Sequence, residues 1–273
     1  MTATAPHHLL HLLGDVRLAA IAASIALAAI VLAWRTGYLT RGGFVAALLV
    51  GVPTAVAFSW AGFALLAFFF LGRDAIAGHA ARRSAKKHDE PVPKYVAKDF
   101  GAIFLSGFLP LAAAGTLVLS ATAGLQHVAI VFFLASLATP FGDWASTEFG
   151  KAYGRKTFQI ITFERVRSGS RGGVSREGSL FGGGAIVLFA AVALALFVTA
   201  GVEVPIQGLE TPELNAKTMV IVVMAAALAN FVESVIAGIF SQFQRSPNKQ
   251  LLCFVGSVIG GALAVSFTNL PAG

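Results

Sequence analysis

Long apolar stretches that carry almost no charge constrain this chain more than any other feature of its sequence. Residues 17–34 contain no charged side chain after Arg17, and about 20 apolar residues in a helix cross a bilayer core about 30 Å thick. Because a water-soluble fold cannot hide so much apolar surface, we expect an all-α bundle of transmembrane helices. Further stretches lie at 42–72, 100–120, 126–147, 177–200, 216–242 and 250–268.

Charge and cysteine content narrow the class further. Charged residues make up 12% of the chain and the mean hydropathy is +0.78, whereas soluble domains carry about 25% charged residues. The net charge of +7 does not indicate a nucleic-acid partner, because the basic residues fall in the segments between apolar stretches, as membrane topology requires. Cys253 is the only cysteine, which excludes an intramolecular disulfide and a thiolate metal cluster.

The distribution of Lys and Arg predicts the topology. The stretch 42–72 is too long for one ordinary span, so we expect two short tilted helices there. All the basic segments then fall on one side, which favours about eight crossings with both termini outside, or seven if one segment is re-entrant. We expect one integral domain over 1–273, with an N-terminal tail at 1–16, in an inner (plasma) membrane. Its basic cytoplasmic loops are 73–98 and 151–176, with shorter basic segments at 35–41 and 243–249.

Two acids near the end of an apolar stretch are the first candidate site. Asp143 and Glu148 lie in TPFGDWASTEFG (139–150), and an acid at membrane depth costs about 2.5–3.5 kcal/mol. About 140° separates them around an ideal helix, so they share one metal only through local unwinding or a bridging water. Carboxylates beside bases suit a magnesium–phosphate site, although bases at this place also complement a helix C-terminus. The bases are Lys151, Arg155 and Lys156.

A glycine-rich segment, SGSRGGVSREGS (168–179), is the second candidate. Its glycines free the backbone to form a concave nest of N–H groups before a helix N-terminus, where anions bind well. The segment is not a Walker A loop, because no Gly-Lys-Ser or Gly-Lys-Thr follows. A flexible loop followed by a small-residue packing face explains the pattern equally well. The residues that would contact phosphate are Arg171, Gly172, Gly173 and Ser175.

A polar stripe in the stretch 216–242 is the third candidate. Asn230, Glu233, Ser234 and Ser241 share one side of a helix, which should face the bundle interior. Glu233 would serve as a second metal ligand or a general base. The alternative is a set of hydrogen bonds between helices, each worth about 0.6 kcal/mol.

Three motifs in this order resemble a known family. They are SLATPFGDWASTEFG (136–150), GSRGGVSREGS (169–179) and ANFVESVIAG (229–238). The chain resembles the integral membrane family of uncharacterised bacterial and archaeal proteins that includes the plant chloroplast phytyl-phosphate kinase. The family is similar to polyprenol and dolichol kinases and to CDP-diglyceride synthases. The chain departs from the family pattern at Ala102 and Ser106, where Gln and Asn are usual.

The resemblance implies a phosphotransferase that acts on a lipid. Family members are thought to pass a phosphoryl group from a nucleotide, typically CTP, to an isoprenoid monophosphate, giving the diphosphate. It implies that Asp143 and Glu148 bind magnesium, and that Glu233 stands where an Asp is usual. It also implies a phosphate loop at Gly172, Gly173 and Ser175, and polar helix residues at Asn230 and Ser234.

Two other classes of function stay open at this point. One is a related CTP-dependent lipid enzyme, either a prenol kinase or a cytidylyltransferase. The other is a membrane transporter whose buried acids carry ions, although no inverted repeat is evident in the sequence. Product formation that depends on a nucleotide separates the enzymes from the transporter, and release of CDP instead of pyrophosphate separates kinase from cytidylyltransferase.

Overall fold

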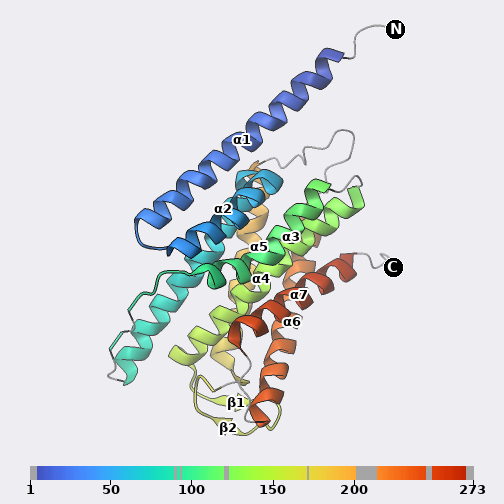
Figure 1. Cartoon of the computed structure of the whole chain (residues 1–273). Coiled ribbons are helices and arrows are strands. Elements are labelled where there is room, and N and C mark those ends of the chain that lie inside the picture. The colour runs from blue at the N-terminus through green and yellow to red at the C-terminus, as the bar shows by residue number, and fades with distance from the viewer. Residues whose placement is uncertain are drawn as a thin grey trace.

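The computed structural model describes residues 5–88, 91–92, 94–119, 123–170, 172–200, 214–243 and 248–268. These residues form an all-α bundle, as predicted, and each of its seven helices is long and apolar enough to cross a membrane (Figure 1). The helices are α1 (Ala5–Arg35), α2 (Arg41–His88), α3 (Phe100–Leu119), α4 (Ala123–Tyr153), α5 (Arg176–Ala200), α6 (Ala216–Gln242) and α7 (Lys249–Thr268).

Helix α2 doubles back on itself within the bundle. Phe58 and Ser59 leave the helical region, and Ser59 has a φ of 59°. A methyl group built on Gly62 would lie 3.4 Å from the carbonyl oxygen of Thr54, a separation that a straight helix does not allow. The turn therefore joins two helical segments into a hairpin (Figure 1), as expected for 42–72, and the break falls after the predicted position near Pro53.

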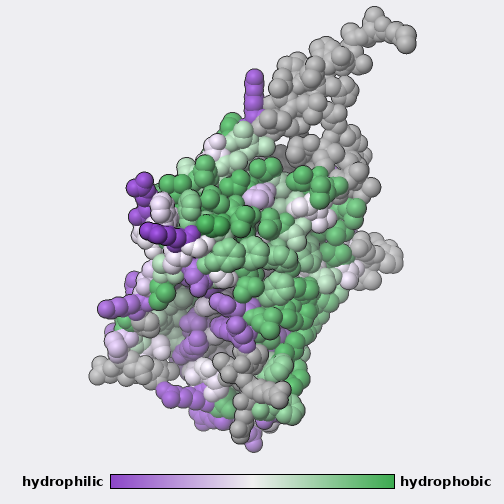
Figure 2. All heavy atoms as spheres, viewed as in Figure 1, coloured by the Kyte–Doolittle hydropathy of each residue, from purple (hydrophilic) through white to green (hydrophobic). Residues whose placement is uncertain are grey.

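The ends of the helices sort into two groups. The described parts of the basic segments lie at the end of the bundle that carries the small sheet, and the start of α1 and the end of α7 lie at the opposite end (Figure 1). With α2 counted as two segments, this arrangement agrees with the topology that the positive charges predict. The outward-facing side chains of the helices are largely apolar, and Figure 2 shows a broad hydrophobic area across the face of the bundle that is in view.

The segment 151–176 is not only a loop. It contains a three-stranded antiparallel sheet of β1 (Thr157–Gln159), β2 (Arg165–Val166) and β3 (Gly173–Ser175), in the order β2-β1-β3. In its register, Phe158 is opposite both Arg165 and Val174. Such short strands produce too weak a periodic signal to be predicted from the sequence.

Helices α1 and α2 extend furthest beyond the predicted spans. Helix α1 begins at Ala5, so most of the segment 1–16 that was expected to be a tail is helical. The basic segment 73–98 is helical as far as His88, because α2 continues past Arg73 without a break. The predicted boundaries were placed where the apolar stretches end. The backbone hydrogen bonds of a helix do not depend on hydropathy, so both helices continue through polar residues.

Small residues allow close approach where the helices cross. On α5, added methyl groups at Gly178 and Gly182 would collide with Ser146 of α4, and on α7 one at Gly260 would collide with Thr139 of α4. Glycine at such crossings lets the backbones of membrane helices pack closely. These crossings fix α4 at the centre of the bundle, between α5 and α7.

Candidate active site

Three helices bring two acids and the cysteine together. Asp143 of α4, Glu233 of α6 and Cys253 of α7 each place one ligand atom so that all three atoms lie within 4.8 Å of one another. The Cys253 thiol donates a hydrogen bond of 3.8 Å to Oδ2 of Asp143. We call these three residues the acidic cluster. Asp143 and Glu233, which the sequence singled out on separate helices, therefore lie next to each other.

The structure leaves room for the Glu233 carboxylate and leaves one of its atoms unsatisfied. Glu233 is 4% exposed, and its Oε2 has no hydrogen-bond partner among the described residues. Gly256 of α7 faces this oxygen so closely that a methyl group there would overlap it. A buried carboxylate oxygen without a donor is costly unless a cation or a proton satisfies it. With Asp143 beside it, the donor set fits a divalent cation that prefers oxygen ligands.

A pocket lined by cations adjoins the acidic cluster. It lies between α2, α3, α4 and α7 and encloses about 220 Å³. Arg73 and Lys249 both lie against the ring of Trp144, with Cζ of Arg73 4.0 Å and Nζ of Lys249 4.2 Å from the ring centroid. Cys253 lines this pocket and belongs to the acidic cluster, so the two are adjacent. We call it the cationic pocket.

A hydrogen-bonded network beside Arg73 stabilises the edge of the cationic pocket. Asp74 accepts hydrogen bonds from the Tyr38 hydroxyl and from Nζ of Lys98, both at 2.6 Å. Burial and the bond to Asp74 raise the pKa of Tyr38 above its ordinary value, so Tyr38 remains a hydrogen-bond donor. The network joins α2 to the segment that leads into α3, and it thereby holds the first turn of α3 at the pocket.

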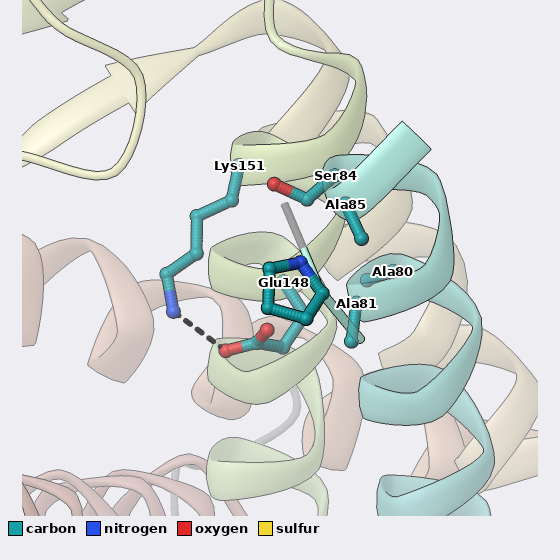
Figure 3. A pocket seen from close by; sticks show the side chains of 7 residues that line it. Ala80, Ala81, Ser84, Ala85, Glu148 and Lys151 are labelled. Atoms are coloured by element: carbon teal, nitrogen blue, oxygen red, sulfur yellow. Dashed lines mark hydrogen bonds and ion pairs between the residues drawn. The ribbon is translucent and has the colours of Figure 1, made fainter. Parts of the chain in front are cut away.

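Glu148 lies apart from the acidic cluster. It pairs with Lys151, whose Nζ is 2.8 Å from Oε1 of Glu148, and both line a second pocket of about 180 Å³ against α2 (Figure 3). The other lining residues include Ala81 and Ser84. A shared metal with Asp143 required local unwinding or a bridging water, and α4 stays helical through both residues. The structure does not bring the predicted ligand Glu148 into the cluster.

The predicted phosphate loop forms packing contacts instead of an open nest. Gly172 has a φ of +66°, and a methyl group there would come within 2.5 Å of Cα of Gly238 on α6. Gly173 begins β3, and the hydroxyl of Ser175, which is buried, accepts a hydrogen bond of 3.1 Å from the Gly178 amide at the start of α5. Their proposed contacts with phosphate stay predictions. Arg171 lies outside the described residues.

The other predicted residues are divided between the cluster and the surface. Asn230 of α6 lies against Gly142, immediately before Asp143, and Ser234 follows Glu233 in a half-buried position. Arg155 and Lys156 are exposed after the end of α4, and the amide of Arg155 donates to Oε2 of Glu177 at 3.5 Å. Their roles in binding a cofactor stay predictions.

Sequence reasoning missed the cationic pocket. Lys249 was assigned only to a basic segment. Arg73, at the close of the predicted hairpin over 42–72, was left open between a topology role and a site role, and Trp144 was given no role. The one available signal in the sequence was Trp144, the aromatic residue next to Asp143. By itself this residue does not show which basic side chains will lie against its ring.

Comparisons with known proteins now place the chain. Residues 24–260 match the family described as integral membrane protein DUF92. The chain belongs to this family. This confirms the resemblance that the three motifs carry, and the matched range includes every residue of the acidic cluster and the cationic pocket.

Two relatives of this DUF92 protein are informative. The chain is 30% identical over 235 residues to protein VTE6, chloroplastic, of Arabidopsis thaliana, a match that covers 83% of this chain and 64% of the relative. It is 26% identical over 237 residues to the uncharacterized membrane protein sll0875 of Synechocystis, covering 83% of this chain and 81% of that protein. The chain thus spans less than two thirds of the Arabidopsis relative. No solved structure matches.

Proposed function

We propose that this protein is a membrane kinase that transfers a phosphoryl group from CTP to an isoprenoid monophosphate, such as phytyl phosphate, and forms the diphosphate. Membership of the DUF92 family and the similarity to the chloroplast protein support a membrane enzyme of prenyl-phosphate metabolism. The site would face the cytoplasm in an inner (plasma) membrane, because the basic segments gather at that end of the bundle.

One observation carries the proposal: a half-buried and a buried acid lie together beside a pocket lined by bases, with Cys253 between the two. Phosphoryl transfer needs positioning and charge neutralisation more than covalent help. Asp143 and Glu233 would hold Mg²⁺, which would neutralise charge on the phosphates when bound. Arg73 and Lys249 would hold the phosphate oxygens in the adjoining pocket.

The reaction itself requires no strong base at the site. An ionised oxygen of the lipid monophosphate attacks the γ-phosphorus of the nucleotide, and a new phosphorus–oxygen bond forms. The bond between the γ-phosphorus and the bridging oxygen breaks, and CDP leaves with the electron pair. The task of the chain is therefore to hold two anions together, which the cations beside the acidic cluster suit.

The nucleotide would approach from the water-facing side of α4. The pocket of Glu148 and Lys151 lies there, between the extended end of α2 and α4 (Figure 3). Lys151, with Arg155 and Lys156 just beyond it, would meet the nucleotide phosphates, and Glu148 would hold Lys151 in place through their ion pair.

The direct test supplies purified protein in detergent with Mg²⁺, CTP and phytyl, geranylgeranyl or farnesyl monophosphate. We expect the lipid diphosphate and CDP in equal amounts, measured by mass spectrometry. Pyrophosphate with a CDP-lipid would instead identify a cytidylyltransferase. Folded protein that forms no product with any nucleotide would contradict the proposal and favour transport.

Replacing Gly256 with Ala should weaken the response to Mg²⁺. The added methyl group overlaps Oε2 of Glu233, so the carboxylate must leave its present position in the acidic cluster. We expect the Mg²⁺ concentration at half-maximal rate to rise about tenfold, whereas Gly183→Ala on α5, where a methyl group meets nothing within 4 Å, leaves it unchanged. If both variants showed the same dependence on Mg²⁺ concentration, Glu233 would not be a metal ligand.

A further inference from the structure

The cationic pocket has two kinds of wall. Arg73, Lys249 and Trp144 form its charged side, and an apolar side faces them. Among the described residues, direct ion pairs join only Lys98 to Asp74 and Lys151 to Glu148, so neither Arg73 nor Lys249 has a carboxylate partner there. The apolar wall consists of Phe69, Leu105, Pro140 and Phe254.

Several features of the charged side favour an anion. Nε of Arg73 is buried and has no hydrogen-bond partner among the described residues. The first turns of α3 and α7 also line the pocket, but the amides of Ala102 and Gln250 already donate to the side chains of Asp99 and Asn248, so the positive charge at the pocket comes from Arg73 and Lys249. A buried guanidinium atom without an acceptor is satisfied by an oxyanion that enters the pocket.

The apolar side leads away from the charges and toward the membrane. Helices α3 and α7 run in the same direction from the pocket (Figure 1), and a ring contact joins them at its edge. The ring centroids of Phe108 and Phe254 are 6.1 Å apart, and Phe108 is 42% exposed on the outer surface of the bundle. Figure 2 shows hydrophilic atoms gathered near the start of α7, directly beside the hydrophobic area.

We propose that the cationic pocket binds the phosphate of a single-chain lipid, which enters sideways between α3 and α7 with its tail across Phe108 and Phe254. This inference rests on the proposed function and specifies which substrate occupies which pocket: the lipid phosphate lies on the side of α3 and α7, and the nucleotide lies on the side of α2. A nucleotide alone would leave the apolar wall and the membrane-facing rings without a partner.

Binding without turnover tests this arrangement. The chain contains three tryptophans, so a Trp34→Phe, Trp60→Phe variant keeps Trp144 as its only tryptophan, inside the pocket. In detergent, without nucleotide, we expect farnesyl monophosphate to change Trp144 fluorescence saturably. Farnesol lacks the phosphate and inorganic phosphate lacks the tail, so each should bind at least tenfold more weakly.

Two substitutions separate the head from the tail. Arg73→Gln should weaken the binding of geranyl and geranylgeranyl monophosphates by about the same factor, tenfold or more. Phe254→Ala should weaken geranylgeranyl monophosphate more than geranyl monophosphate, because only the longer tail extends past the ring pair. Arg35→Gln is the matched control, since it removes a guanidinium that lies over the aromatic ring at position 34, outside the pocket, and it should leave both affinities unchanged.

The outcomes also separate this inference from the proposed function. Saturable binding that needs Arg73, in a protein that forms no diphosphate, would keep the lipid-phosphate site and remove the kinase assignment. Turnover whose KM for the lipid is the same in wild type, Arg73→Gln and Phe254→Ala would overturn the inference while the kinase stands. Inorganic phosphate that binds as tightly as farnesyl monophosphate would also overturn it, because the pocket would then take a free anion.

Discussion

Replacing Asp143 with Asn is expected to reduce the rate of diphosphate formation by about a thousandfold or more. Asn has nearly the same shape, so the packing of α4 against α6 and α7 should be kept, while the negative charge that would hold Mg²⁺ beside Glu233 is lost. The measurement is kcat with saturating CTP and geranylgeranyl monophosphate, across a series of Mg²⁺ concentrations. Excess Mg²⁺ should restore little of the rate, because the remaining carboxylate offers too few ligands.

Glu148→Gln tests whether the metal is held in the acidic cluster or near the pocket of Lys151. Glu148 is five positions along the same helix and pairs with Lys151, so its loss should act mainly on the KM for CTP. Glu233→Gln should instead resemble Asp143→Asn. If Glu148→Gln lowered kcat as much as Asp143→Asn did, and Glu233→Gln did not, the metal would be shared by Asp143 and Glu148 through a bridging water, and the cluster would be a packing feature. Retention of the wild-type elution volume in detergent shows that each variant is folded.

The helical bundle was predictable because hydropathy reports it directly. Segments such as 17–34 and 100–120 have no other stable environment, and the basic residues fixed which ends lie together. The hairpin in α2 followed from length alone. Its exact turn did not, because Phe58 and Ser59 carry no glycine or proline signal, and the reversal depends on tertiary packing such as that of Phe58 on Phe133.

The site was predictable only in part. An acid at membrane depth is costly, and that cost singled out Asp143, Glu148 and Glu233, of which Glu148 lies outside the acidic cluster. The meeting of the other two acids with Cys253 depends on how three helices pack, which no pattern within one helix specifies. Arg73 lies within α2 and Lys249 begins α7, about 176 positions later in the sequence, and both are among many bases that positive-inside topology already explains.

The glycine pair was assigned to phosphate because its composition matches a nest, and the structure offers a different explanation that a substitution can test. Gly172 lies where the sheet meets α6, and its φ of +66° is a conformation that residues with side chains rarely adopt. The neighbouring Gln159 also donates to the hydroxyl of Ser241 on α6. Close backbone contact at this place holds the basic segment against the bundle.

Gly172→Ala is therefore expected to destabilise the protein by about 3 kcal/mol or more, from backbone strain together with the collision with Gly238. Thermal unfolding in detergent, followed by circular dichroism, measures the change. Gly37→Ala is the matched control, since Gly37 has a φ of +77° and a methyl group there meets nothing within 4 Å, so strain alone should cost about 1 kcal/mol. Equal losses in the two variants would remove the packing role. A Gly172→Ala protein as stable as wild type but with a raised KM for CTP would restore the phosphate loop that the sequence predicts.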